Sequence, residues 1–463
     1  MRLAKVVLLI PFLLFPFSLF ALSDDALSAR LEANNLEIRK AREDYRVALL
    51  DVKDARAGRG PTIDMAITGT YMYRPLVGPV TVSTQNLLQQ LSDQGVNVSA
   101  YSGSPDAYLK LYGGMEHTLY AFSLNITQPV FTWGKISQAI RLYQKIADTR
   151  ALQITALVRK QRSELFAREN AIQHLLKTRE LLAEQSETAS RLVEIVSSAR
   201  DNGMLLDGDV LKAQIQTRQI DIGLRQVEME LSTQLLAIQD LCADETITLD
   251  DISYELEEKD FNELHDLGEE TLILRAVSPQ MDNLGILRSL EEVADLATGI
   301  SQASVNWKPD FALQTSVGYG GSRFPVLEKD WYRQDDYTLN FTVAIKSTVW
   351  DGGKKLRDVT RNQTTAEIAK VDYSQAVQKI RNEVSTQYLQ MSLDMDKLAY
   401  QDMVIESDRT DWEQKKNLSE SGYGSETDEL KAKLQWQADR LEKQKLLLDR
   451  DSCYHALMYL EGK

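Results

Sequence analysis

Two patterns of apolar and polar residues recur along this chain. In four short segments, apolar and polar side chains alternate strictly, as expected for a strand with one apolar and one polar face. These segments are 62–73, 119–131, 310–319 and 337–349. Within 119–131 the apolar face consists of Tyr120, Phe122, Leu124, Ile126 and Val130. The alternation therefore predicts four amphipathic strands.

The second pattern is helical. Residues 135–202 and 354–421 contain neither glycine nor proline, and their apolar residues recur at intervals of three and four. At 1.5 Å per residue, each helix would be about 100 Å long, so it has to pack lengthwise in a coiled-coil manner. Shorter helices are predicted over 24–57, 209–242, 271–302 and 425–461, with an acidic, irregular link over 243–268.

Both patterns belong to an internal duplication with an offset of 219 residues. The matched positions are Gly134 with Gly353, Gly203 with Gly422, and Asp209 with Asp428. We therefore predict a first repeat over 24–242, the link over 243–268 and a second repeat over 269–463. Each repeat contributes two strands and one long helix.

The first 23 residues have the character of a signal peptide. Arg2 and Lys5 precede an apolar run, and Ala21-Leu22-Ser23 provides a small-residue cleavage site. A membrane anchor is the competing interpretation, but two prolines interrupt the run. Removal of this leader changes the net charge from −15 to −17. Such acidity argues against a nucleic-acid partner, because phosphate binding needs clustered basic residues.

Catalytic chemistry finds no support in the sequence. The two cysteines, Cys242 and Cys453, are too few for a disulfide scaffold or a cysteine-ligated metal. The histidines are isolated, without metal-ligand spacing: His117, His174, His265 and His455. We expect no enzyme activity, no cofactor and no metal site. The long helices and the acidity also fit a structural or adhesive coiled-coil protein of the cell envelope, which would form no pore.

Four amphipathic strands fit a membrane β-barrel with a wet interior, although a soluble sheet covered by helices has the same period. Four strands cannot span a bilayer alone, because an open sheet leaves edge amides unpaired in hydrocarbon. Several chains must then pool their strands. Three copies would give 12 strands, enough for a barrel with a useful channel.

The chain resembles the TolC-like outer-membrane efflux protein family, in its non-lipidated branch. The resemblance rests on the duplication, on the strand-to-helix junctions 131–134 and 350–353, and on the helix turns 202–211 and 421–430. It implies an α+β fold in which a homotrimer forms a 12-stranded outer-membrane barrel continuing into a periplasmic helical tunnel. It also implies a passive exit duct, joined by a periplasmic adaptor to an inner-membrane pump for efflux or type I secretion.

The resemblance also implies roles for the two helix turns. Their residues would form the periplasmic tips that the adaptor grips: Gly203, Met204, Leu205, Gly422, Tyr423 and Gly424. The alternative is that both glycines only end a helix. Asp428 matches an acidic ring that narrows the tunnel entrance, with Asp209 as its repeat equivalent. Lys431 stands where the family has a second acid, which leaves open a pair between Lys431 and Asp428. The alternative for Asp428 is the capping pattern Ser425-x-x-Asp428 at the start of a helix.

Two further expectations concern the strand ends. Residues 74–118 form the longer of the two strand connections, and we predict a partly ordered loop outside the cell. Aromatic residues beside the strands are predicted to form an interfacial belt, with core packing as the alternative: Tyr71, Tyr73, Trp331, Tyr332 and Tyr337.

Overall fold

The structure is a computed structural model that describes residues 24–74, 78–101, 103–113, 116–252, 261–305, 309–321, 337–348 and 350–462. The chain divides into two compact units. One is helical and comprises the described residues of 1–50, 144–295 and 363–463. The other comprises those of 51–143 and 296–362 and contains the strands. The segment predicted as a signal peptide, together with Trp331 and Tyr332, lies outside the described residues.

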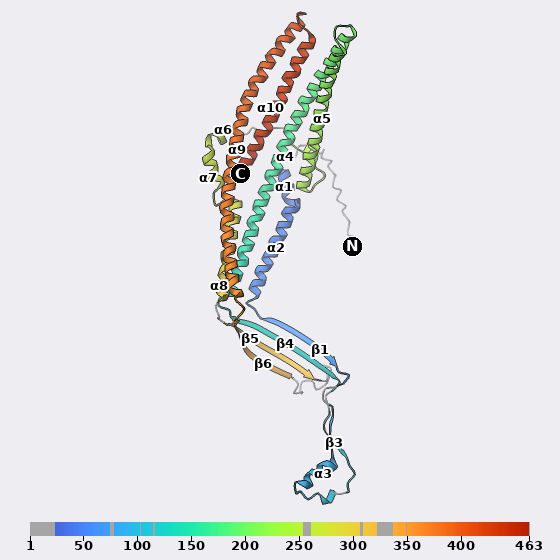
Figure 1. Cartoon of the computed structure of the whole chain (residues 1–463), viewed down its shortest axis with the longest axis vertical. Helices are drawn as coiled ribbons and strands as arrows, with labels where there is room; N and C mark the ends of the chain where they lie inside the picture. The colour runs from blue at the N-terminus through green and yellow to red at the C-terminus, as the bar shows by residue number, and fades with distance from the viewer. Residues whose placement is uncertain are drawn as a thin grey trace, which may run out of the picture. The chain divides into compact units, whose positions relative to one another are not determined.

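Two long hairpins make up most of the helical part (Figure 1). The helix α4 (Lys135–Asp201) turns into α5 (Asp207–Cys242), and α9 (Lys354–Glu420) turns into α10 (Glu426–Glu461). The first helix of each hairpin has 67 residues and the second has 36. The bounds of α9 lie 219 residues after those of α4, and the bounds of α10 lie 219 residues after those of α5. The duplication predicted from the sequence is therefore present in the fold.

The buried core repeats with the same offset. One cluster joins α4 and α5 to α1 (Asp24–Asn34), and its largest members include Leu165, Ile172 and Ile238. The equivalent positions in the second repeat are Val384, Met391 and Leu457. These pack with α6 (Phe261–Leu267) and α7 (Glu269–Ala276). Each hairpin is therefore covered at the same level by different short helices.

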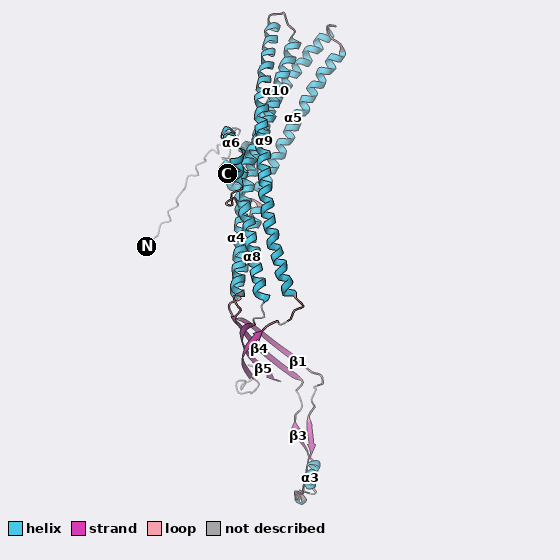
Figure 2. Ribbon diagram, turned by 60° about the vertical axis from the view of Figure 1, so that its left-hand side comes forward, coloured by secondary structure: helices cyan, strands magenta, loops and turns pink. Residues whose placement is uncertain are grey.

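A third cluster crosses from one hairpin to the other. Leu192 and Val196 of α4 and Val210 of α5 pack with Leu430 and Leu434 of α10. In Figures 1 and 2 the turns of both hairpins lie at the same end of the helical unit. The two repeats thus share one core close to their turns.

Two of the predicted shorter helices are broken in the structure. The segment expected as one helix over 24–57 forms α1 and α2 (Leu36–Ala57), separated at Asn35. The Asn35 carboxamide oxygen accepts a hydrogen bond from the Ile38 amide (3.0 Å) and its nitrogen donates to the Leu241 carbonyl (2.8 Å). The segment expected over 271–302 forms α7 and α8 (Asp282–Val305). Pro279 lies between them and cannot continue a helix.

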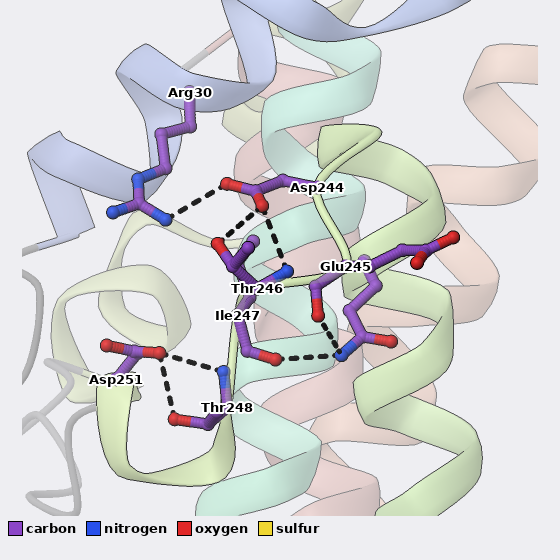
Figure 3. A network of polar contacts seen from close by, with 8 residues as sticks. Arg30, Asp244, Glu245, Thr246, Ile247, Thr248 and Asp251 are labelled. Atoms are coloured by element: carbon purple, nitrogen blue, oxygen red, sulfur yellow. Dashed lines mark hydrogen bonds and ion pairs between the residues drawn. The ribbon is translucent and has the colours of Figure 1, made fainter.

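The link between the repeats is more ordered than its composition indicated. Figure 3 shows Asp244 accepting from Thr246 and forming an ion pair with Arg30 (3.0 Å). The Thr246 hydroxyl, its amide and then Arg30 lower the pKa of Asp244. Thr248 and Asp251 form a reciprocal capping box at a short 3-10 helix, Leu249–Asp251. Local side-chain to backbone bonds therefore compensate for the lack of apolar periodicity.

The four predicted strands form one antiparallel sheet in the order β1-β4-β5-β6. Their bounds are β1 (Thr62–Tyr71), β4 (Thr118–Phe131), β5 (Asp310–Gly321) and β6 (Tyr337–Lys346). The register aligns one apolar row, Met65, Leu124, Val317 and Leu339, and beside it one polar row, Asp64, Asn125, Ser316 and Asn340. The sheet therefore has one apolar and one polar face, as the alternation predicted.

Alternation alone gives the wrong position for one residue of this sheet. Val130 was expected on the apolar face, but a register shift occurs between Pro129 and Phe131. Phe131 pairs with Phe311 and takes the apolar position instead. Pro129 has no amide hydrogen to donate, which is consistent with a bulge at this point.

The long connection after β1 contains a small folded element. It consists of β2 (Val80–Ser83), α3 (Thr84–Asp93), a 3-10 turn at Ser99–Tyr101 and β3 (Tyr108–Tyr112). The Asp106 carboxylate accepts hydrogen bonds from the Ser83 hydroxyl (2.6 Å) and the Gln85 amide (3.2 Å). These bonds, the Ser83 one first, lower the pKa of Asp106. The ordered part of this loop agrees with the sequence expectation, while its exposure outside the cell stays a prediction.

The strand-to-helix junctions use the same backbone conformation in both repeats. Trp133 and Gly134 have φ of 53° and 79°, and Gly352 and Gly353 have φ of 64° and 77°. Trp133 adopts this conformation without being glycine, and its indole nitrogen donates to the Pro309 carbonyl (2.9 Å). That bond ties the junction to the residue before β5.

Within the described ranges, no helix combines the length and the apolar character that crossing a bilayer requires.

Candidate functional site: hairpin tips and exposed helix faces

Each hairpin ends in the same tight turn. The Gly203 amide donates to the Arg200 carbonyl and the Met204 amide to the Ala199 carbonyl, both at 2.8 Å. The same two bonds form around Gly422, at 3.0 Å each. Gly203 and Gly422 have φ of 73° and 75°, so both end a helix in the left-handed conformation that favours glycine. The alternative interpretation of these glycines, as helix C-caps, is therefore correct as far as geometry goes.

The two tips differ in what they expose. A Cβ on Gly424 would lie 2.9 Å from the Leu418 Cβ, so this position requires glycine. Its equivalent is Leu205, which is half-buried against the shared core. Met204 at the first tip and Tyr423 at the second are 74% and 89% exposed. Each tip thus presents a large apolar side chain to solvent.

The acidic residues predicted for the gate lie in the first turns of α5 and α10. Asp209 forms an ion pair with Lys212 (3.4 Å), whereas Asp428 and Lys431 are both exposed. In the described part of the chain, Asp428 and Lys431 do not pair with each other. The predicted cap is partly correct, because the Ser425 hydroxyl accepts from the Thr427 amide (3.2 Å) rather than from Asp428. The Asp428 carboxylate is therefore available at the tip.

One ion pair joins the hairpins next to these tips. Arg191 of α4 donates to Glu426 of α10 at 2.7 Å. This hydrogen bond raises the pKa of Arg191. Both side chains are well exposed, so water screens the pair and its contribution to stability is small. The shared apolar core carries most of the contact between the tips.

A second feature of α5, which the sequence motifs at the tips did not reveal, lies along the length of the helix. Its buried residues form one stripe: Val210, Ala213, Ile220, Leu231, Ile238 and Cys242. A further apolar stripe is at least half exposed: Leu211, Ile215, Ile222, Met229 and Leu236. We call this second stripe the outer seam of α5. From Ile215 on, it repeats every seven residues, and it lies about 200° around the helix from Ala213.

The equivalent stripe on α10 is covered within the chain. At the offset of 219, the first three outer-seam positions correspond to Leu430, Leu434 and Leu441, which belong to the core shared with α4. Direct contacts follow the same face, since Gln185 of α4 donates to the Leu434 carbonyl (3.2 Å). The outer seam of α5 is thus a packing surface whose counterpart in the second repeat already has a partner.

A matching surface lies on α9. Leu389, Leu393, Tyr400 and Met403 are exposed there, and we call them the α9 stripe. Two of the equivalent positions on α4 contact α10: His174 bonds to Asp451 (3.0 Å) and Glu184 to Arg440 (3.0 Å). The α9 stripe therefore lies on the helix face that corresponds to the α4 face in contact with α10.

Comparison with solved structures defines the class of fold. The CmeC outer membrane channel of Campylobacter jejuni has a TM-score of 0.71 at 14% identity, covering 95% of this chain and 85% of that chain. VceC of Vibrio cholerae has a TM-score of 0.69 at 14% identity, covering 95% and 96%. The open state of MtrE from Neisseria gonorrhoeae has a TM-score of 0.67 at 12% identity, covering 95% and 88%. The fold is therefore the expected α+β, TolC-like fold of outer-membrane channels.

A family match covers most of the second repeat. Residues 290–463 match the family described as outer membrane efflux protein. No curated protein matches the chain by sequence. The second repeat therefore carries an outer membrane efflux protein domain, and together with the TolC-like fold this match confirms the resemblance inferred from the repeat and its motifs. This is a family of outer-membrane channel proteins rather than of enzymes.

Replacing Gly422 with alanine should destabilise the second tip by roughly 1–2 kcal/mol, because alanine is strained at positive φ. The matched control is Gly208→Ala, which lies in the first turn of α5 with no atom near the new Cβ. Hydrogen exchange of tip peptides measures the difference. Equal exchange in both variants would contradict the assigned role of Gly422.

Proposed function

We propose that this chain forms, as a homotrimer, the outer-membrane exit duct of a tripartite efflux or type I secretion system. The duct is passive, with the strands in the outer membrane and the helices in the periplasm. A periplasmic adaptor would join it to an inner-membrane pump. The observation that carries this proposal is the four-stranded sheet with one exposed apolar face.

The sheet is suited to lipid on one side and water on the other. On its apolar face Phe341 and Val343 are 71% and 69% exposed, and Met65 on β1 is 64% exposed. In the described residues, β1 and β6 each pair along one edge only. Hydrocarbon leaves no water to satisfy the other edges. Pairing of β1 with β6 of the next copy would satisfy them, and three copies would close a 12-stranded barrel.

The helices support the same ring of subunits. Within one chain, the stripe of α10 that contains Leu430, Leu434 and Leu441 packs on α4. By repeat equivalence, the outer seam of α5 would pack on the α9 stripe of the next copy. This contact is head-to-tail, because different surfaces meet, and such contacts either close into a ring or continue as a filament. Closure of the barrel favours the ring.

The tips are the best candidates for adaptor contact. Gly203, Met204 and Leu205 would act with Gly422, Tyr423 and Gly424 at the periplasmic end. The exposed Met204 and Tyr423 side chains supply apolar anchors of the kind that dominate protein interfaces. Leu206, 76% exposed, adds a third such residue.

The function is tested by isolation and electrical recording. The protein should fractionate with the outer membrane, run as a heat-sensitive trimer in detergent, and give discrete single-channel currents in planar bilayers. A monomer that is extracted without detergent would overturn the proposal and favour the coiled-coil structural alternative.

A charge introduced on the outer seam of α5 tests the proposed ring of helices. Ile222→Glu should weaken each subunit contact by about 2 kcal/mol or more, because the carboxylate would be buried against an apolar stripe. The control is Gln216→Glu, an exposed α5 position about 120° away around the helix. Native mass spectrometry in detergent should find monomer for Ile222→Glu only. Equally stable trimers in both variants would refute the assigned contact.

The Asp428 ring is tested by ion selectivity. Three Asp428 carboxylates around a threefold axis would favour cations at the entrance. Asp428→Ala should reduce the cation-to-anion permeability ratio by roughly a factor of two or more at low salt. Reversal potentials in a salt gradient provide the measurement, with Asp207→Ala at the first tip as the control. An unchanged ratio in Asp428→Ala would remove this role, and Lys431 and Asp209 would remain to be tested in the same way.

A further inference from the structure

The α9–α10 hairpin contains a carboxyl pair along the seam between its two helices. Asp408 of α9 and Asp439 of α10 are hydrogen-bonded to each other. Gln401 donates to the Asp439 carbonyl (3.1 Å), and Gln435 lies 3.3 and 3.4 Å from the two Asp439 carboxylate oxygens. A hydrogen bond between two carboxyl groups needs a proton on one of them. Burial and then Asp408 raise the pKa of Asp439 to about 6.

The first hairpin has apolar residues at the same two positions. At the offset of 219, Asp408 corresponds to Ala189 and Asp439 to Ile220, and these are 1% and 8% exposed in the core of α4 and α5. Gln401, only 7% exposed, corresponds to Leu182 of the same core. The two hairpins therefore share a backbone design but differ in what holds their helices together.

Aromatic stacking continues the seam of the second hairpin towards its tip. Trp412 of α9 and Trp436 of α10 stack with ring centroids 5.0 Å apart and planes at 13°. Lys416 and Lys433 lie over the Trp412 ring at 5.8 and 5.9 Å. The stack lies within about one helical turn of each aspartate in sequence, so separation of the carboxyl pair would also strain it.

The basic groups around the pair are engaged elsewhere. Arg440, beside Asp439, bonds to Glu184 of α4 (3.0 Å) and lies over Trp436. Lys443 of α10 forms an ion pair with Asp402 of α9. On α9 itself, Arg409 pairs with Glu406 and Glu413, and Lys415 with Asp411. In the part of the chain that the structure describes, no arginine or lysine forms an ion pair with Asp408 or Asp439. Two facing carboxyl groups without a cation favour the retention of a proton by one of them.

We propose that Asp408 and Asp439 form a proton-dependent latch between α9 and α10, closed by a proton held between the two side chains and loosened when that proton is lost. Because the folded-state pKa of Asp439 is raised above 3.8, its stabilising effect is complete below about pH 4 and is lost as the pH rises through about 6. The α10 helix begins at the tip that carries Tyr423 and Asp428, so loosening would act on that tip first. This inference does not depend on the trimer or the exit duct.

Hydrogen exchange on the full-length protein tests the latch at pH 5 and pH 7.5, after correction for intrinsic exchange rates. Peptides covering 401–415 and 432–443 should open about tenfold more at pH 7.5, allowing for solvent screening of the two-unit shift. The α4–α5 peptides over 157–172 and 231–242, whose apolar core contains no α10 residue, serve as the internal reference and should not change. Equal pH dependence in both hairpins, or none in either, would overturn the proposal.

Two variants separate the latch from general effects of pH. Asp408→Asn keeps a neutral donor for the Asp439 carboxylate and should hold the seam closed at both pH values. The double variant Asp408→Ala with Asp439→Ile introduces the apolar pair of the first hairpin and should also abolish the pH dependence. If hydrogen exchange of the α9–α10 peptides depends on pH as strongly in either folded variant as in the wild type, the latch is refuted. The comparison of the two hairpins in the wild-type protein remains decisive even if one variant does not fold.

Discussion

The need to satisfy the edges of one small sheet governs the rest of this protein. Four antiparallel strands present an apolar face, yet along the described chain the outer edges of β1 and β6 have no strand partner. Backbone amides left open in hydrocarbon cost several kcal/mol each. A single chain with this sheet is therefore incomplete in a membrane, and the proposed trimer supplies what it lacks.

The internal duplication makes such an assembly simple to build. The two hairpins start and end at equivalent positions and reuse the same turn at Gly203 and Gly422. The contact between α10 and α4 inside the chain serves as a template for the proposed contact between α5 and the next copy's α9. Three chains would then provide six nearly equivalent hairpins around one axis. A ring of this kind needs one type of helix contact rather than two.

Departures from the repeat carry the differences in chemistry. Ala189 and Ile220 give the first hairpin a stable apolar seam, while Asp408 and Asp439 give the second a polar one. Leu205 packs into the shared core, while its equivalent Gly424 allows a closer turn. Partly buried carboxyl groups cost stability unless they are neutralised or hydrogen-bonded. A carboxyl pair at these two positions of the second repeat, where the first repeat has apolar residues, is the basis of the latch proposed between α9 and α10.

The sequence by itself determined the elements, the duplication and the fold family. Glycine-free helices, strict alternation and left-handed glycines are local features, and their signals survive in a single chain. The break at Asn35 and the register shift at Phe131 lay beyond a simple periodic pattern, because capping and strand pairing decide them. Pro279, in contrast, is a local signal for the break between α7 and α8 that the periodic pattern overlooked. Only the tertiary structure decided which apolar stripes are covered. Leu430 and Leu211 look alike in the sequence, but one packs against α4 and the other stays exposed, because burial depends on which helix lies alongside.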